Sequence, residues 1–323
     1  MQKKTTISVI TLIIIVIVVS TFLILTPWES TEEQKITDVT SNPFLWRIEG
    51  ENPSYLYGSI HLADERVLIL PDIVIEAIDD ADIVYTEVEL DQETQIKSAE
   101  YSILPGDQTL YDLLPPDVAN RLNEYLASKG VASTAFSQLK VWAVATSLVI
   151  LEDIENLLNN LPLDQYIWSL AISKGKGTGG LETVEEQLDI FDTLSLEEQI
   201  YLLNDTLDDI EECAEKGQSV TGVMIDAYIE GDLEILHNLT YADFDMNNPL
   251  EVKLRTQLFT DRNYNMVQRI SQLITDNPDT QYFFTIGAGH YYGEDGILEL
   301  LENEGFTMTR IEFNTCESCD PGE

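Results

Sequence analysis

The chain begins with an apolar stretch that no water-soluble domain would leave uncovered. Residues 5–25 include no charged side chain and few polar ones. As a helix, such a stretch crosses the roughly 30 Å hydrocarbon core of a bilayer. Lys3 and Lys4 precede it, whereas the first charged residue after it is the acidic Glu29. The positive-inside rule then places the N-terminus in the cytoplasm and the rest of the chain outside.

A cleaved signal peptide is the competing interpretation of this stretch. The apolar run is long for a signal peptide, and the residues after Leu25 are a poor match to the small residues at a cleavage site. No cysteine lies next to the stretch, which excludes a lipoprotein anchor. We therefore expect an uncleaved transmembrane anchor at residues 1–28 and a polar linker at residues 29–42. The protein would be a single-pass protein of the cell membrane with an extracytoplasmic C-terminal domain.

The chain as a whole is strongly acidic. It has 58 Asp and Glu against 17 Lys and Arg, for a formal net charge of -41. Such a surface repels nucleic-acid phosphates and anionic lipid headgroups, so we expect no nucleic-acid partner and no domain lying flat on the membrane. Solubility in a salty medium and attraction of cations both remain as explanations. With 323 residues, 44% of them hydrophobic, the chain can still bury a sizeable core.

The cysteines do not define the fold. There are three, Cys213, Cys316 and Cys319, and a domain of this size needs no disulfide scaffold. Only Cys316 and Cys319 have CxxC spacing, so a four-cysteine zinc site is excluded. They lie in residues 315–323, which we interpret as an acidic tail.

Strand patterns lie near both ends of the extramembrane part, and helical patterns lie between them. Strands are expected in residues 44–49 and 54–57 as a hairpin, and in residues 82–88, 281–286 and 306–313. From about residue 115 to 274 the pattern is mainly helical, and the glycine-rich residues 174–180 indicate a turn before a short strand or a helix start. The sequence predicts one α+β domain, residues 43–314, with a mixed β-sheet core from both ends of the chain and a helical middle region.

Two of the three histidines stand in the same local pattern, an apolar strand followed by Gly-x-x-His. His61 follows Gly58 in this way, and His290 follows Gly287. Glycine allows a tight turn and leaves room for a ligand, and strand ends are where α/β proteins place their sites. One such pattern is more often structural, but its repetition indicates a joint role as metal ligands or general base. His237 lacks this setting, and we interpret it as a surface or packing residue.

Glu87, Glu89 and Arg262 complete the candidate site. Two histidines are too few for a catalytic metal, which usually has three protein ligands and a water. Glu87 is the best third ligand because it leaves the end of a buried apolar strand, where a carboxylate needs a partner. Glu89 lies on the same strand face as a candidate ligand or base, and Arg262 is a candidate for stabilising an oxyanion. The plain alternatives are solvent exposure for the carboxylates and a salt bridge for the arginine.

In these and further motifs the chain resembles the TraB/PrgY/GumN (Tiki-like) family. The resemblance covers roughly residues 42–314. It rests on five ordered stretches, namely residues 44–46 with 55–62, 81–84 with 87–90, 181–187, 261–263 with Met266, and 287–293 with Gly296. Ser59 stands where threonine is commoner in the family.

The resemblance implies an α+β fold shared with haem-binding ChaN-like proteins and erythromycin esterases. It also implies that His61, His290 and Glu87 lie together in one cleft with Arg262 nearby. For the Tiki branch it implies a metalloprotease that requires manganese or cobalt, whereas other branches are linked to pheromone shutdown or have no known reaction. We therefore expect a divalent metal ion (manganese, cobalt or zinc) and a peptide or protein substrate.

Three functions are compatible with these residues. The leading one is a metal-dependent hydrolase, specifically a peptidase, in which His61, His290 and Glu87 bind the ion that activates water. The second is a metal-free hydrolase in which one histidine activates water directly. The third is a non-enzymatic surface protein that sequesters a peptide signal, which a closed histidine–carboxylate pair without a cleft would favour.

Overall fold

The computed structural model describes residues 44–241 and 244–312. The anchor and linker expected at residues 1–42, and Cys316 and Cys319 of the tail, lie outside the described residues and stay predictions. Within the described ranges, no helix is both long and apolar enough to cross a bilayer.

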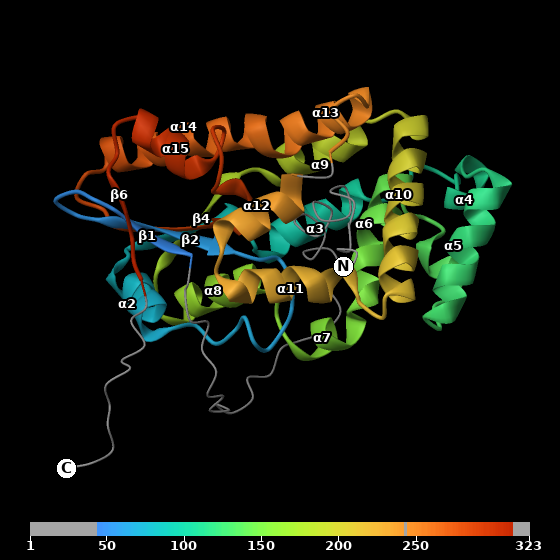
Figure 1. Ribbon diagram of the computed structural model, residues 1–323, viewed down its shortest axis with the longest axis horizontal. Coiled ribbons are helices and arrows are strands. Elements are labelled where there is room, and N and C mark those ends of the chain that lie inside the picture. The colour runs from blue at the N-terminus through green and yellow to red at the C-terminus, as the bar shows by residue number, and fades with distance from the viewer. Residues whose placement is uncertain (1–43, 242–243, 313–323) are drawn as a thin grey trace, which may run out of the picture.

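One six-stranded mixed sheet forms the centre of the fold, in the order β4-β3-β5-β2-β1-β6 (Figure 1). Its strands are β1 (Leu45–Ile48), β2 (Ser54–Ser59), β3 (Ile83–Val88), β4 (Gly177–Glu182), β5 (Tyr282–Gly287) and β6 (Met308–Arg310). Strands β4, β3, β5 and β2 are parallel to one another, and β1 runs antiparallel to both β2 and β6. The mixed sheet and the hairpin predicted from the sequence are confirmed.

The two strands β2 and β5 are the most buried part of this sheet. Every residue of both strands is buried, which is typical of parallel strands covered on both faces. Their register pairs Tyr55 with Phe283 and Gly58 with Ile286. The residues that follow β2 and β5 therefore emerge side by side at one edge of the sheet.

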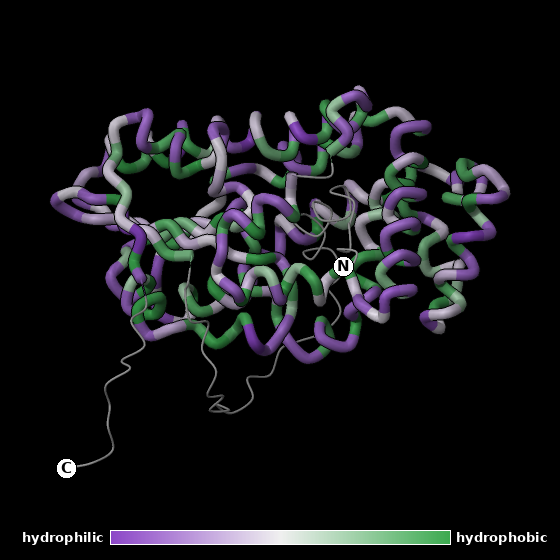
Figure 2. The backbone as a smooth tube through the Cα atoms, viewed as in Figure 1, coloured by the Kyte–Doolittle hydropathy of each residue, from purple (hydrophilic) through white to green (hydrophobic). Residues whose placement is uncertain are grey.

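Helices and short helical turns make up most of the chain between the strands. They are α2 (Asp72–Asp80), α3 (Gln92–Tyr101), α4 (Leu110–Leu113), α5 (Pro116–Ser128), η2 (Ser133–Phe136), α6 (Val141–Glu152), α7 (Ile154–Asn159), α8 (Leu163–Ser173), α9 (Val184–Asp192), α10 (Leu196–Glu215), α11 (Val220–Glu230), α12 (Leu233–Tyr241), α13 (Pro249–Arg255), η3 (Thr256–Thr260), α14 (Asp261–Asp276), η4 (Ala288–His290) and α15 (Ile297–Asn303). In Figure 1, α14 and α15 lie along one side of the sheet, and α2, α8 and α11 lie along the other. Figure 2 shows hydrophilic residues spread along outer helices such as α10 and α14, as the acidic composition requires.

Strand β4 shows that the middle region is not purely helical. The glycine-rich residues, for which the sequence allows a strand or a helix start, pair in parallel with β3. A Cβ atom at Gly179 would lie 2.7 Å from the ring of Tyr85, and one at Gly177 would lie 3.2 Å from Ile83. The glycines therefore let an edge strand pack against large side chains of β3.

Candidate functional site

The C-terminal ends of the four parallel strands meet at one edge of the sheet, and each brings a residue to the same place. These residues are His61 after β2, Glu87 in β3, Glu182 at the end of β4, and Gly287 and His290 at the end of β5. Open α/β sheets bind their ligands at this edge. The structure thus brings together the three residues that the sequence predicts as metal ligands.

Glu87 is the centre of this cluster. Its Oε1 accepts a hydrogen bond from the Gly287 N–H at 2.7 Å and lies 3.3 Å from His61 Nε2. Its Oε2 accepts a hydrogen bond from Arg262 Nη2 at 2.6 Å. Burial alone would raise the pKa of this carboxyl group, but the charges of Arg262 and His61 hold the pKa well below its usual range. Glu87 is therefore a buried carboxylate with both oxygens engaged.

Gly287 allows the histidines and Glu87 to approach one another. A Cβ atom at this position would lie 3.1 Å from His61 Nε2, 3.2 Å from Glu87 Oε1 and 3.7 Å from His290 Cδ2. Any side chain here would push the His61–Glu87 pair apart. Gly58 has a different role, because a Cβ atom there would lie 2.8 Å from the Cβ of Phe44 in the core. The two Gly-x-x-His patterns are alike in sequence but not in what their glycines make room for.

Asp164 of α8 orients the ring of His61. The Nδ1 atom lies 2.6 Å from Asp164 Oδ2, and the other carboxylate oxygen accepts a hydrogen bond from the Ser59 hydroxyl. Burial opposes a charged ring, but the carboxylates of Asp164 and Glu87 raise the pKa of His61 to about 10. The ion pair with Asp164 stabilises the protonated ring, whose Nε2 is directed at Glu87.

Asn263 of α14 orients the ring of His290. Its amide nitrogen donates to the backbone carbonyl of Asp295 at 2.7 Å, so its amide oxygen faces His290 Nδ1 at 2.5 Å. The proton of the ring is therefore on Nδ1, and Nε2 lies 3.3 Å from Arg262 Nη1. Burial and the charge of Arg262 lower the pKa of His290 to about 3, so this ring is neutral.

Arg262 is the cation of the cluster and is only 4% exposed. Besides Glu87, its guanidinium donates to Glu182 Oε2 from Nε at 3.0 Å and from Nη2 at 2.7 Å. Gln187 of α9 donates to both carboxylates, at 3.3 Å to Glu87 and 3.0 Å to Glu182. Arg262 thus joins carboxylates from two neighbouring strands, which is the salt bridge that the sequence left as an alternative.

Two other residues singled out in the sequence lie outside this buried cluster. Glu89 follows the end of β3 and is exposed, although Glu87 two positions earlier is buried. His237 packs against the rings of Tyr241 and Tyr292, with ring centroids 4.4 and 5.0 Å apart. These ring contacts agree with the interpretation of His237 as a packing residue.

The donor atoms fit a metal ion in part. In a tetrahedral site with ligand bonds of about 2.1 Å, two ligand atoms lie roughly 3.4 Å apart, and the 3.3 Å between His61 Nε2 and Glu87 Oε1 matches this spacing. Each histidine has its Nδ1 held by another residue, as metal-binding histidines usually do. Across residues 44–241 and 244–312, however, no group of three or more His, Cys, Asp or Glu residues is close enough to hold an ion.

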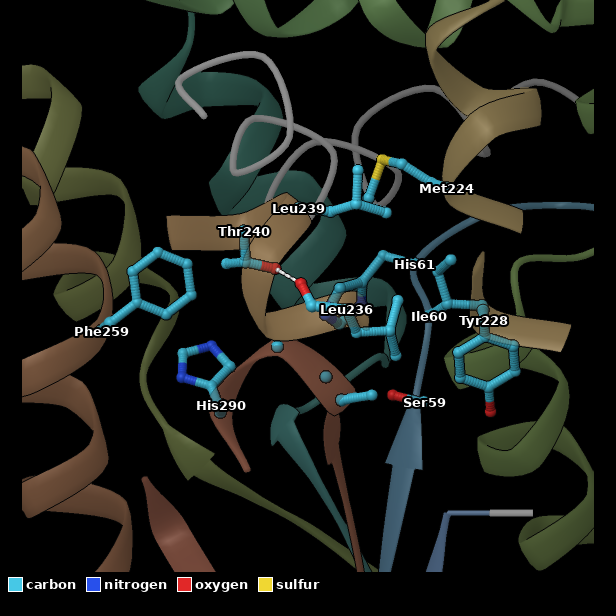
Figure 3. Close-up of a pocket in the computed structure, with 13 residues that line it drawn as sticks. Ser59, Ile60, His61, Met224, Tyr228, Leu236, Leu239, Thr240, Phe259 and His290 are labelled. Carbon is cyan, nitrogen blue, oxygen red and sulfur yellow. Dashed lines mark hydrogen bonds between the residues drawn. The ribbon is translucent and has the colours of Figure 1, made fainter. Parts of the chain in front are cut away.

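A cavity of about 60 Å³ lies beside the two histidines (Figure 3). His61, Gly287 and His290 form part of its lining, and half of the other ten lining residues are apolar or aromatic residues of α11, α12 and η3. The histidine–carboxylate pair is therefore not closed off on every side, because a part of a ligand fits next to it.

Three residues of the cluster have roles that the sequence alone does not assign. Glu182 and Asn263 belong to stretches that carry the family resemblance, so that resemblance is the signal that marks them. Asp164 lies on α8 without any motif around it, and only the structure shows that it contacts His61.

Comparisons with known proteins give a family match and several named relatives. Residues 44–310 match the TraB/PrgY/gumN family. The chain is 30% identical over 310 residues to "Metalloprotease TIKI1" of Danio rerio, covering 83% of this chain and 63% of that protein. It is 29% identical over 311 residues to "Metalloprotease TIKI1" of Homo sapiens, covering 83% of this chain and 61% of that protein.

The matches differ in how much of each relative they cover. The chain spans less than two thirds of the length of both metalloproteases. It covers 89% of "Uncharacterized protein YbaP" of Shigella flexneri, to which it is 21% identical over 255 residues, or 79% of this chain. No solved structure matches the chain significantly.

Proposed function

This chain belongs to the TraB/PrgY/gumN family, and we propose that it is a membrane-anchored, extracytoplasmic metallopeptidase with His61, His290 and Glu87 as metal ligands. The observation that carries the proposal is that His61 Nε2 lies 3.3 Å from Glu87 Oε1, while Nδ1 of both His61 and His290 is held by an outer residue. Such outer partners are typical of histidines that bind a metal through Nε2.

The residues of the cluster divide into ligands and residues that position them. His61 and Glu87 stand at ligand spacing. The unprotonated Nε2 of His290 faces Arg262 Nη1 at 3.3 Å and would exchange this contact for the ion. A divalent ion at this place would polarise a substrate carbonyl and lower the pKa of a bound water. Arg262 keeps Glu87 ionised and in place. A base role for Glu89 and an oxyanion role for Arg262 stay predictions.

The substrate and the location of the protein are part of the same proposal. The name "Metalloprotease" of the relatives supports a peptide or protein substrate. The apolar stretch at residues 5–25 and the charges around it support a membrane anchor with the catalytic domain outside the cytoplasm.

Metal-free hydrolysis fits the cluster less well. A histidine that acts as general base needs a pKa near the working pH. The pKa of His61 is raised to about 10 by Asp164 and Glu87 against the effect of burial, and the pKa of His290 is lowered to about 3 by burial and Arg262. In these protonation states neither ring is suited to remove a proton from water at neutral pH, whereas a metal ion would bind His61 by displacing its Nε2 proton.

Removal of metal is the direct test of the proposed function. Full-length protein in detergent should carry about one equivalent of manganese, cobalt or zinc, measured by elemental mass spectrometry. Exhaustive chelation should lower cleavage of a mixed peptide library by about a hundredfold or more, since a catalytic metal supplies several kcal/mol, and one of these ions should restore it. Unchanged cleavage after chelation would instead identify a metal-free hydrolase.

Asp164→Asn should weaken metal binding and catalysis without unfolding the protein. Loss of an outer partner of a metal ligand typically costs about 10- to 100-fold in metal affinity or activity. Metal titration and kcat/KM measure the two effects. The matched control is Asp226→Asn, because the side chain of Asp226 is 70% exposed and pairs with Arg66. Equal values for both variants would show that Asp164 does not position His61.

A further inference from the structure

We propose that the cavity beside His61 and His290 binds one aliphatic side chain of the substrate next to the cleaved bond. This inference rests on the proposed function, and it adds the chemical class of substrate that the site selects. The position of the cavity supports it, because His61, Gly287 and His290 line both the cavity and the ligand cluster.

Apolar side chains make up most of the cavity wall. They include Met224 and Tyr228 of α11, Leu236 and Leu239 of α12, and Phe259 of η3. Figure 3 shows them arranged around the space beside His61 and His290. A substrate group in this space would exchange water for carbon contacts, which favours an apolar group over a polar one.

The polar groups on the cavity wall already have partners within the protein. The hydroxyl of Tyr228 donates to the Gly58 carbonyl at 2.7 Å, and that of Ser59 donates to Asp164. The Thr240 hydroxyl donates to the Leu236 carbonyl at 2.7 Å, the bond drawn in Figure 3. The protons of these hydroxyls are therefore not available to a substrate acceptor, so the cavity discriminates against groups that need a donor, such as a carboxylate.

The size of the cavity selects among apolar groups. Since about 10–15 Å³ of such space takes one water-sized group, a cavity of about 60 Å³ takes roughly four to six non-hydrogen atoms. The side chains of leucine, isoleucine and methionine, with four non-hydrogen atoms each, are of this size, and valine with three also fits, whereas the indole of tryptophan is too large. We therefore expect an aliphatic residue at one fixed position beside the cleaved bond.

Cleavage of a random peptide library by the full-length metal-loaded protein tests the preference. Mass spectrometry of the products should show leucine, isoleucine, valine or methionine enriched about 10- to 200-fold over aspartate and glutamine at one position beside the cut. This is the range that pockets for apolar groups give. Cleavage without any such enrichment would overturn the inference and leave the proposed function intact.

Two variants should move the preference in opposite directions. A Cβ atom at Gly289, which lines the cavity, would lie 3.4 Å from Thr240 Oγ1 and 3.8 Å from Phe259. Gly289→Ala therefore fits without a clash, narrows the cavity and should raise the valine-to-leucine cleavage ratio about tenfold. Leu239→Ala widens the cavity and should favour phenylalanine over leucine. Identical ratios in both variants and the parent would contradict the inference.

A binding measurement separates failure of this inference from failure of the proposed function. N-acetyl-leucinamide should bind the parent protein at least about tenfold more tightly than N-acetyl-glutamine amide, as followed by saturation-transfer NMR. Gly289→Ala should weaken the leucine probe selectively. If no peptide is cleaved but this selectivity is found, the cavity assignment stands and the peptidase proposal falls. Equal binding of both probes would reject the cavity assignment.

Discussion

Arg262→Met should lower the free energy of unfolding by about 3–5 kcal/mol, the usual cost of removing one partner from a buried ion pair. Arg262 is the cation between Glu87 and Glu182, at 2.6 and 2.7 Å from their oxygens. Methionine has a similar length but no charge, so it would leave two carboxylates in the protein interior without this partner. Urea unfolding followed by circular dichroism measures the effect.

Arg269→Met is the matched control for this variant. Arg269 lies on the same helix, α14, and pairs with Glu186, but its side chain is 37% exposed. Exposed ion pairs are typically worth about 0–1 kcal/mol, so the control should unfold close to the parent. If Arg262→Met and Arg269→Met unfold at the same urea concentration, the buried cluster does not hold the strands together as described.

Alanine in place of His61 or His290 should lower peptide cleavage by about a thousandfold or more. Loss of an outer partner alone costs about 10- to 100-fold, and loss of a ligand removes the group that those partners orient. Both variants should also lose stoichiometric metal. The two measurements are kcat/KM for a library-derived peptide and metal content by elemental mass spectrometry.

His237→Ala is the control that the chain itself provides. It is the remaining histidine of the sequence, and it packs against Tyr241 and Tyr292 instead of joining the cluster. Its activity and metal content should stay within about threefold of the parent, since His237 is not part of the cluster and changes away from a site have small effects. Metal content that is the same in His61→Ala, His290→Ala and His237→Ala would remove the proposed ligand set.

The parts of the site that sequence reasoning reached share a local signal. His61 and His290 each follow an apolar strand and a glycine. This pattern can be recognised in the sequence without knowing which strands pair in the sheet. Glu87 can be predicted as a site residue because a carboxylate at the end of a buried strand needs a cation or a hydrogen-bond donor as a partner. The parallel pairing of β5 with both β2 and β3 places these three residues together.

The remaining parts depend on contacts between distant segments. Asp164 contacts His61 because the fold brings helix α8 next to it, and no sequence motif around Asp164 indicates this contact. Glu89 is two positions after Glu87, the spacing of one strand face, but β3 ends at Val88 and Glu89 is exposed. Three of the six residues of strand β4 are glycines, and at Gly179 the reason is the Tyr85 ring on the next strand. Periodicity describes one segment at a time, so it cannot assign such pairs.

The position of β5 in the sheet has a consequence for how the chain matures. This strand stands between β2 and β3, and the hydrogen bond from Tyr282 to Ser54 joins residues 228 positions apart. During synthesis, β2 and β3 are made long before β5. Until β5 pairs with them, their strand edges are unpaired and prone to pair with other chains. The sheet is completed only when nearly the whole polypeptide has been synthesised. A truncated product that ends before residue 282 would lack the centre of the molecule rather than its periphery.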